Sequence, residues 1–69
     1  MRLSAPNQIK GLIVDIRKGV VTAYVRLDIG GGVILTASMP NEAVDDLGLA
    51  ADQVAVAVIG ASDVMIGIA

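Results

Sequence analysis

The chain has 69 residues, of which 55% are hydrophobic and 17% charged, with a net charge of −2 at pH 7. This length predicts a single domain over residues 1–69, and so small a domain buries only about 60% of its unfolded surface. The sequence contains neither Cys nor His, which excludes disulfides and thiolate or imidazole metal sites. We therefore expect partner subunits to supply the missing stability.

Several classes of function lack their usual sequence signals. No apolar run follows Arg2, as it would in a signal peptide, and no continuous apolar stretch reaches the roughly 18 residues of a membrane span. The five basic residues form no stripe and Tyr24 is the only aromatic residue, whereas nucleic-acid binders combine basic stripes with stacking aromatics. We expect a cytoplasmic protein that binds neither membranes nor nucleic acid.

Residues 8–17 and 20–29 form the first two predicted strands. The first places Leu12, Val14 and Ile16 on one face, and the second alternates strictly between two faces, as half-buried strands do. Between them, Lys18 and Gly19 suit a tight hairpin, because glycine tolerates a positive φ angle.

Three consecutive glycines at residues 30–32 predict a second hairpin turn. A phosphate-binding loop is not supported, since no strand–loop–helix context and no Gly-Lys-Ser/Thr ending follow. Residues 33–39 alternate as a third strand, which Pro40 ends because proline has no N–H to donate.

A short helix is predicted between Asn41, as its N-cap, and Gly48, just beyond its end. Its acidic residues are interpreted as a solvated face, because one or two helical turns lack the loop geometry of a calcium site. Val54–Ile59 and residues 64–68 form the fourth and fifth predicted strands. The order β-β-β-α-β-β predicts an all-β fold with one short helix, namely an OB-fold-like five-stranded Greek-key barrel.

The available side chains favour binding over catalysis. Acyl transfer by a serine triad needs a base, usually His, and the acidic residues lie mostly in turns and on the helix. Small hydroxyls and backbone N–H groups collect where strands end, and such donors suit an oxyanion that carries no proton near neutral pH. Serines at strand ends also commonly bond their own backbone. These strand-end donors come from Ser4, Gly19, Val20, Ser38 and Ser62.

Four stretches resemble the molbindins, small molybdate-binding proteins of the Mop type whose module is also called TOBE. They are SAPNQIKG, GVVTAYV, EAVDDLGL and GASDVMIGIA, and the resemblance covers essentially the whole chain. It implies an OB-like barrel, a homohexamer built as a trimer of dimers, and molybdate or tungstate at subunit interfaces, with no cationic metal site. The implied oxyanion-binding residues are Ser4, Ala5, Asn7, Ala61 and Ser62, with Gly19 and Val20 at a second kind of site that uses backbone N–H groups.

Two basic residues of the family motifs are missing. Pro6 stands in place of the arginine of Ser-Ala-Arg-Asn, and Gly60 in place of the lysine of Lys-Ala-Thr/Ser-Asp. Charge-assisted hydrogen bonds contribute about 1.5–3 kcal/mol each, so losing two corresponds to roughly a few thousandfold in affinity.

Two functions remain open on the sequence. One is intracellular binding of molybdate for storage or homeostasis. The other is a molbindin-like structural or interaction oligomer whose anion site is degenerate or altered. Molybdate and tungstate stay equal alternatives, as do storage, delivery and sensing.

Overall fold

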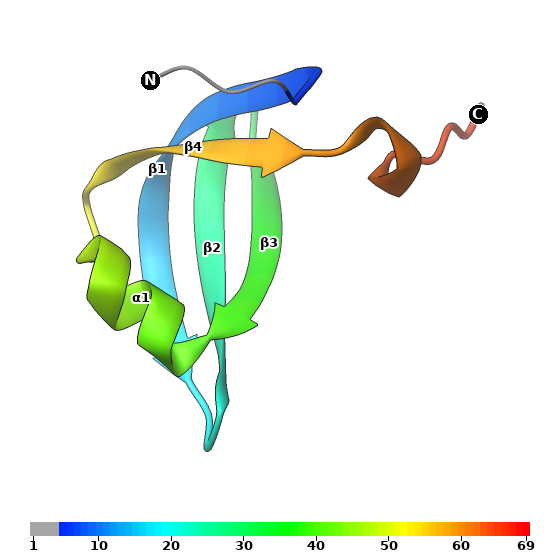
Figure 1. The fold of residues 1–69 in the computed structure, drawn as a ribbon. Helices are drawn as coiled ribbons and strands as arrows, with labels where there is room; N and C mark the ends of the chain where they lie inside the picture. The colour runs from blue at the N-terminus through cyan, green and yellow to red at the C-terminus, as the bar shows by residue number, and fades with distance from the viewer. Residues whose placement is uncertain (1–4) are drawn as a thin grey trace.

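The computed structural model describes residues 5–69 as one curled antiparallel sheet with a short helix (Figure 1). The sheet order is β3-β2-β1-β4, so the last strand returns beside the first, as in a Greek key. This curled half-barrel confirms the predicted fold class of an all-β protein with one short helix. The elements are β1 (Asn7–Lys18), β2 (Thr22–Gly30), β3 (Val33–Pro40), α1 (Asn41–Leu47), β4 (Val54–Ile59) and the 3-10 turn η1 (Ala61–Asp63).

The first strand is bulged, and the bulge changes which of its residues face the core. Ile13 is fully buried, whereas Leu12 and Val14 are each 41% exposed. Ile16 packs against the core, so the prediction that Leu12, Val14 and Ile16 share one face is wrong. The register with β2 shifts between Ile13 and Asp15. Val14 is therefore an extra residue, and it returns Ile16 to the core side. Alternation in the sequence alone does not reveal such a shift.

The centre of the core comes from β2. Ala23, Val25 and Leu27 are buried, on the face that the alternating pattern predicted, and Val44 of α1 packs with them. Ile13 completes this cluster from β1. The backbone of Ile13 also holds the connection from α1 to β4, because its N–H donates to the Gln53 carbonyl over 2.9 Å and its carbonyl accepts from the Asp52 N–H over 2.8 Å.

The two hairpins have different turns. Gly30, Gly31 and Gly32 have φ angles of 97°, 62° and 77°, which confirms the predicted glycine turn between β2 and β3. Gly19 is not among the residues with a positive φ angle. Its N–H donates to the Thr22 carbonyl over 2.8 Å, so residues 19–21 form a wider turn than the predicted Lys18-Gly19 pair.

The helix ends as predicted but begins differently. Gly48 has a left-handed conformation and its N–H donates to the Asp45 carbonyl, as a helix C-cap does. Pro40 occupies the N-cap position and no side chain caps the helix. The predicted capping role of Asn41 is therefore wrong, because its side chain bonds the first hairpin instead.

Residues 5–69 form no fifth strand. Residues 64–69 follow η1 without regular secondary structure and lead away from the sheet (Figure 1). Met65, Ile66 and Ile68 are 90%, 88% and 98% exposed. The prediction of a strand at residues 64–68 is wrong for the isolated chain, because a strand needs a neighbour for its backbone hydrogen bonds. In the described part of the chain, no helix is long and apolar enough to cross a membrane.

Candidate functional site

The predicted site residues form two groups at opposite ends of β1. Asn7 begins β1 opposite Ile59 of β4, so Ala61 and Ser62 in η1 follow at the same end of the sheet. Gly19 and Val20 come after the other end of this twelve-residue strand. At about 3.3 Å per residue, the two groups are separated by roughly 40 Å along the strand. One chain therefore presents two separate groups of donors.

The Ser62 end consists of Ala5, Asn7, Ala61 and Ser62, and Ser4 lies outside the described residues. The Asn7 side chain donates from Nδ2 to the Ile59 carbonyl over 3.2 Å, which ties the start of β1 to the end of β4. η1 is exposed, and its turn is closed by the Asp63 N–H donating to the Gly60 carbonyl over 3.0 Å. Ser62 makes no hydrogen bond with residues 5–69, which leaves its hydroxyl open as a donor.

Charge at the Ser62 end is negative rather than positive. A Cβ atom on Gly60 would lie 3.0 Å from Oδ2 of Asp63, so the Asp63 carboxylate sits close to the position of the missing lysine. Lys10 is exposed and, three residues along β1, falls on the opposite face from Asn7. Among the described residues, this end therefore offers neutral donors without a facing cation.

The hairpin end is organised by Asn41. Its Nδ2 atom donates to the carbonyls of Gly19, over 3.0 Å, and Val20, over 3.3 Å. Its backbone N–H donates to the Val21 carbonyl over 2.8 Å. In a trans peptide the C=O and the following N–H point in opposite directions, and no described peptide bond is cis. The N–H groups of residues 20–22 are therefore directed away from Asn41.

This geometry presents donors outward rather than enclosing a ligand. The N–H of Gly19 is already bonded to the Thr22 carbonyl, whereas Val20 is 99% exposed at the tip of the turn. An ion pair between Lys18 and Asp45 links the base of the hairpin to α1 as well. The hairpin end is thus held in place by the helix, but within one chain it covers only one side of an anion.

Sequence reasoning missed the role of Asn41, because an asparagine after Pro40 matches a helix cap. Its partners Gly19 and Val20 lie 22 and 21 residues earlier in the chain. No local pattern links positions so far apart. The Oδ1 atom of Asn41 is buried and has no hydrogen-bond partner in the described structure, so its Nδ2 group alone makes the contact.

A third polar group lies on the outer face of the sheet. Arg26 donates from Nε and Nη2 to both carboxylate oxygens of Asp15. This hydrogen bonding lowers the pKa of Asp15 and raises that of Arg26. Because the two charges neutralise each other, the pair is a poor oxyanion site. Within residues 5–69, no cluster of three acidic side chains could hold a metal ion.

The sequence matches a known family over nearly its whole length. Residues 3–66 match the model of the TOBE domain. A "Probable molybdenum-pterin-binding protein" from Haemophilus influenzae is 44% identical over 68 residues, and the match covers 99% of each chain.

Solved structures of this type share the fold. MopII from Clostridium pasteurianum, in an apo form, superimposes with a TM-score of 0.90 at 42% identity, covering 97% of this chain and all of that one. The cytoplasmic molybdate-binding protein ModG, with molybdate bound, gives a TM-score of 0.91 at 42% identity, and this chain spans 49% of it. This chain therefore belongs to the TOBE-domain family and is of the Mop, or molbindin, type.

Proposed function

We propose that this protein binds molybdate, or tungstate, inside the cell and serves in its storage or homeostasis. The ligand is held at interfaces between subunits of a homo-oligomer, with a hexamer as the expected assembly. The observation that carries the proposal is the likeness to ModG, a cytoplasmic protein whose structure contains molybdate; the match covers all of this chain and 49% of ModG.

The donors of this chain fit a fully deprotonated oxyanion. The Ser62 hydroxyl and the outward N–H groups at Val20 and Val21 offer hydrogens without needing any from the ligand. Such a site discriminates against anions that carry a proton, because a ligand O–H would meet another donor. Molybdate is unprotonated near neutral pH, whereas phosphate ions carry one or two protons there.

An interface location follows from the openness of both ends. η1 is exposed, and the N–H groups of Val20 and Val21 at the hairpin tip point away from Asn41. Neither end surrounds a ligand, so donors from a second copy are needed to complete a shell. Binding rather than catalysis is favoured because the sequence lacks His and Cys.

Isothermal titration with sodium molybdate at pH 7.5 tests the proposal, with sodium phosphate as the matched anion. We expect saturable molybdate binding with a Kd in the micromolar range or below and much weaker phosphate binding. Elemental analysis of protein purified from molybdate-supplemented cells should find molybdenum. Absence of heat with molybdate and absence of co-purified metal together would contradict the proposal.

A second candidate is a structural or interaction oligomer with a degenerate or altered anion site. The specific observation in its favour is the negative Asp63 carboxylate beside Gly60, where the family has a lysine. On this alternative, the natural chain assembles normally but binds molybdate only after basic residues are restored.

A further inference from the structure

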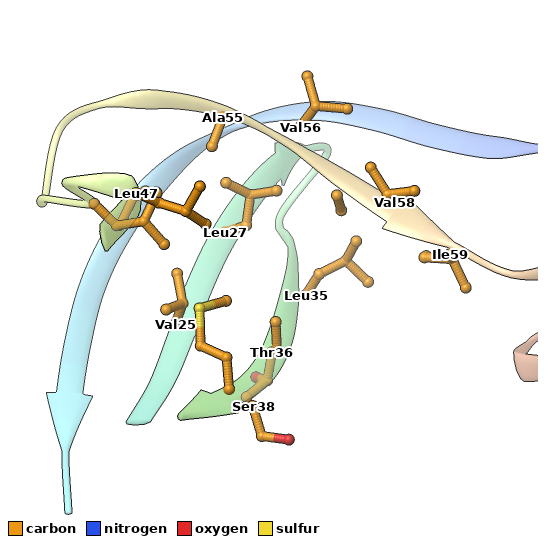
Figure 2. Close-up of a pocket in the computed structure, with 15 residues that line it drawn as sticks. Val25, Leu27, Leu35, Thr36, Ser38, Leu47, Ala55, Val56, Val58 and Ile59 are labelled. Carbon is orange, nitrogen blue, oxygen red and sulfur yellow. The ribbon is translucent and has the colours of Figure 1, made fainter. Parts of the chain in front are cut away.

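Each face of the sheet carries a pocket, and the two pockets differ in chemistry. The pocket on the core side has a volume of about 400 Å³ and a mostly apolar lining that includes Val25 and Leu27 (Figure 2). The pocket on the other face, here called the outer pocket, has a volume of about 340 Å³, which falls in the range of small-ligand sites. All of its lining side chains carry a polar group, and they are Asp15, Arg17, Tyr24, Arg26 and Thr36.

The register of the sheet brings these five side chains together. Tyr24 and Arg26 alternate with the buried residues of β2 and therefore point to the outer face. Tyr24 lies opposite Arg17 of β1. Arg26 lies opposite Asp15 of β1 and Thr36 of β3. Side chains that are opposite each other in neighbouring strands have Cβ atoms about 4.5–5.5 Å apart. Without the bulge in β1, Asp15 and Arg17 would fall on the core side instead.

The charges of the outer pocket leave one cation without a partner. Two hydrogen bonds from Arg26 occupy the carboxylate of Asp15. They are the main reason why the pKa of Asp15 is lowered, and the charge of Arg17 lowers it further. Arg17 itself makes no hydrogen bond or ion pair with residues 5–69. Its guanidinium therefore offers free N–H donors and one positive charge to a ligand.

The ring of Tyr24 adds a flat apolar surface beside this charge. Tyr24 is the only aromatic residue of the chain and is 52% exposed. Its hydroxyl makes no hydrogen bond with residues 5–69. Aromatic rings stack on one another and on guanidinium planes. A planar ligand can therefore lie against Tyr24 while its acidic group meets Arg17 on the neighbouring strand.

A carboxylate is the acidic group that suits this pocket best. The planar guanidinium of arginine binds a carboxylate through two parallel hydrogen bonds. A carboxylate carries a single negative charge at pH 7, which matches the one unpaired cation, Arg17. A phosphoryl group carries about −1.5 to −2 there, and the excess charge would be repelled by the nearby carboxylate of Asp15. The Thr36 hydroxyl, opposite Arg26, is a further neutral donor in the pocket.

We propose that the outer pocket binds a small planar aromatic carboxylate, with its ring against Tyr24 and its carboxylate on the guanidinium of Arg17. The inference goes beyond the proposed function, because it concerns neither end of β1 and its ligand is not a tetrahedral oxyanion. The Asp15–Arg26 pair holds Arg26 in place and limits the charge that the pocket accepts.

Proton NMR of the natural chain in D₂O tests the proposal. The sequence contains no His, Phe or Trp, so the aromatic side-chain signals belong to Tyr24 alone. Ring-deuterated benzoate is the probe, acetate lacks its ring, and ring-deuterated benzyl alcohol lacks its charge. With benzoate we expect a saturable shift of the Tyr24 signals and a Kd of about 1 mM or below. Acetate and benzyl alcohol should each bind at least about tenfold more weakly.

Substitutions in the pocket separate the charge of Arg17 from charge in general. Arg17→Gln should weaken benzoate binding about tenfold or more, because it removes charge-assisted hydrogen bonds. Lys10→Gln removes an equal charge from an exposed position farther along β1 and should leave the affinity unchanged. Arg17→Lys keeps the charge without the planar pair of donors and should lie between them. Far-UV circular dichroism checks that each variant keeps its sheet.

A second comparison tests why the ligand carries only one charge. Phenyl phosphate should bind the natural chain more weakly than benzoate does. It should also gain more affinity than benzoate from Asp15→Asn, which removes the negative charge of the pocket. Tighter binding of phenyl phosphate to the natural chain would overturn the choice of a carboxylate.

Three other results would overturn the proposal. They are the absence of a saturable Tyr24 shift with benzoate, equal losses for Arg17→Gln and Lys10→Gln, and displacement of benzoate by molybdate. The proposed molybdate binding concerns other residues, so a failure with benzoate leaves it to its own titration.

Discussion

The two ends of β1 differ in how much of their geometry the chain itself supplies. At the hairpin end, Asn41 bonds the carbonyls of Gly19 and Val20, and α1 is also joined to the hairpin by the Lys18–Asp45 ion pair. At the Ser62 end, one side-chain hydrogen bond from Asn7 joins β1 to β4, and η1 is exposed. The first end is preorganised within one chain, whereas the second is not.

This difference separates the two ends by the kind of donor they use. Backbone N–H groups are effective only when the backbone is held, and the helix holds it at the hairpin. Side-chain donors depend on charge and on neighbours. At the Ser62 end, Gly60 stands in place of the lysine of the family motif, and the Asp63 carboxylate lies close to it. We therefore expect added or removed charges to change molybdate affinity most at the Ser62 end. At the hairpin end, we expect the largest change when the side chain that anchors the backbone, Asn41, is replaced.

The largest effect is expected from restoring the two family cations with Pro6→Arg and Gly60→Lys together. Two charge-assisted hydrogen bonds of about 1.5–3 kcal/mol each should raise molybdate affinity by roughly a hundredfold or more. Gly60 has a φ angle of −65°, which any side chain can adopt. Titration calorimetry measures the change. A double variant with the same added charge in the loop before β4, Ala50→Arg with Ala51→Lys, is the control, and equal affinities for the two would contradict the assignment of the Ser62 end.

Removing the hairpin anchor should have the next largest effect. Asn41→Ala deletes two hydrogen bonds and is expected to lower the free energy of unfolding by about 1–2 kcal/mol, with weaker anion binding at the hairpin. Asn41→Asp should be at least as damaging, because a carboxylate has no N–H and would face two carbonyls. Chemical denaturation and titration measure the two quantities.

Gln53→Ala is the matched control for the anchor. Its side-chain amide also makes two hydrogen bonds, to Gly48 and Ala50, but far from the hairpin in sequence. It should lower stability and leave anion affinity unchanged. If it weakened binding as much as Asn41→Ala, binding would follow overall stability rather than the hairpin.

A smaller effect is expected from Ser62→Ala. The hydroxyl is exposed and makes no bond with residues 5–69, so stability should not change. Loss of one neutral hydrogen bond, about 0.5–1.5 kcal/mol, should weaken molybdate binding by up to about tenfold. Ser38→Ala on β3 is the control. Unchanged affinity for Ser62→Ala would favour the alternative of a degenerate site at this end.

The smallest effect on molybdate binding is expected from breaking the Asp15–Arg26 pair, which belongs to neither the Ser62 end nor the hairpin end. Hydrogen bonding from Arg26 lowers the pKa of Asp15 below its ordinary value of 3.8. The pair therefore contributes its full stability above that value and loses it as the pH falls through the lowered pKa. Thermal unfolding of the natural chain and of Asp15→Asn should differ at pH 7 and converge toward pH 2. A difference that is constant with pH would contradict this linkage, and molybdate affinity at neutral pH should be the same for both chains.

The local patterns of the sequence were sufficient for much of the fold. The alternation of residues 20–29 predicted the buried face of β2, the bounds Val54–Ile59 of β4 were correct, and the glycines at residues 30–32 predicted a hairpin. These features depend on neighbouring residues, whose side-chain period and backbone freedom can be seen directly in the sequence. The positions of Asn7 and Ser62 at one end followed as soon as β1 and β4 were paired.

Tertiary structure alone decided the bulge at Val14, the anchoring of the hairpin by Asn41 and the unpaired C-terminal segment. Each depends on a partner distant in the chain or absent from it. A bulge can be recognised only from the register with the neighbouring strand. Whether an asparagine side chain caps a helix or bonds a hairpin depends on which groups lie within hydrogen-bond distance. An apolar segment forms a strand only where the edge of a sheet offers backbone hydrogen-bond partners. The sequence determined which residues can form strands, turns and donors, and the packing of distant segments determined which of those possibilities were used.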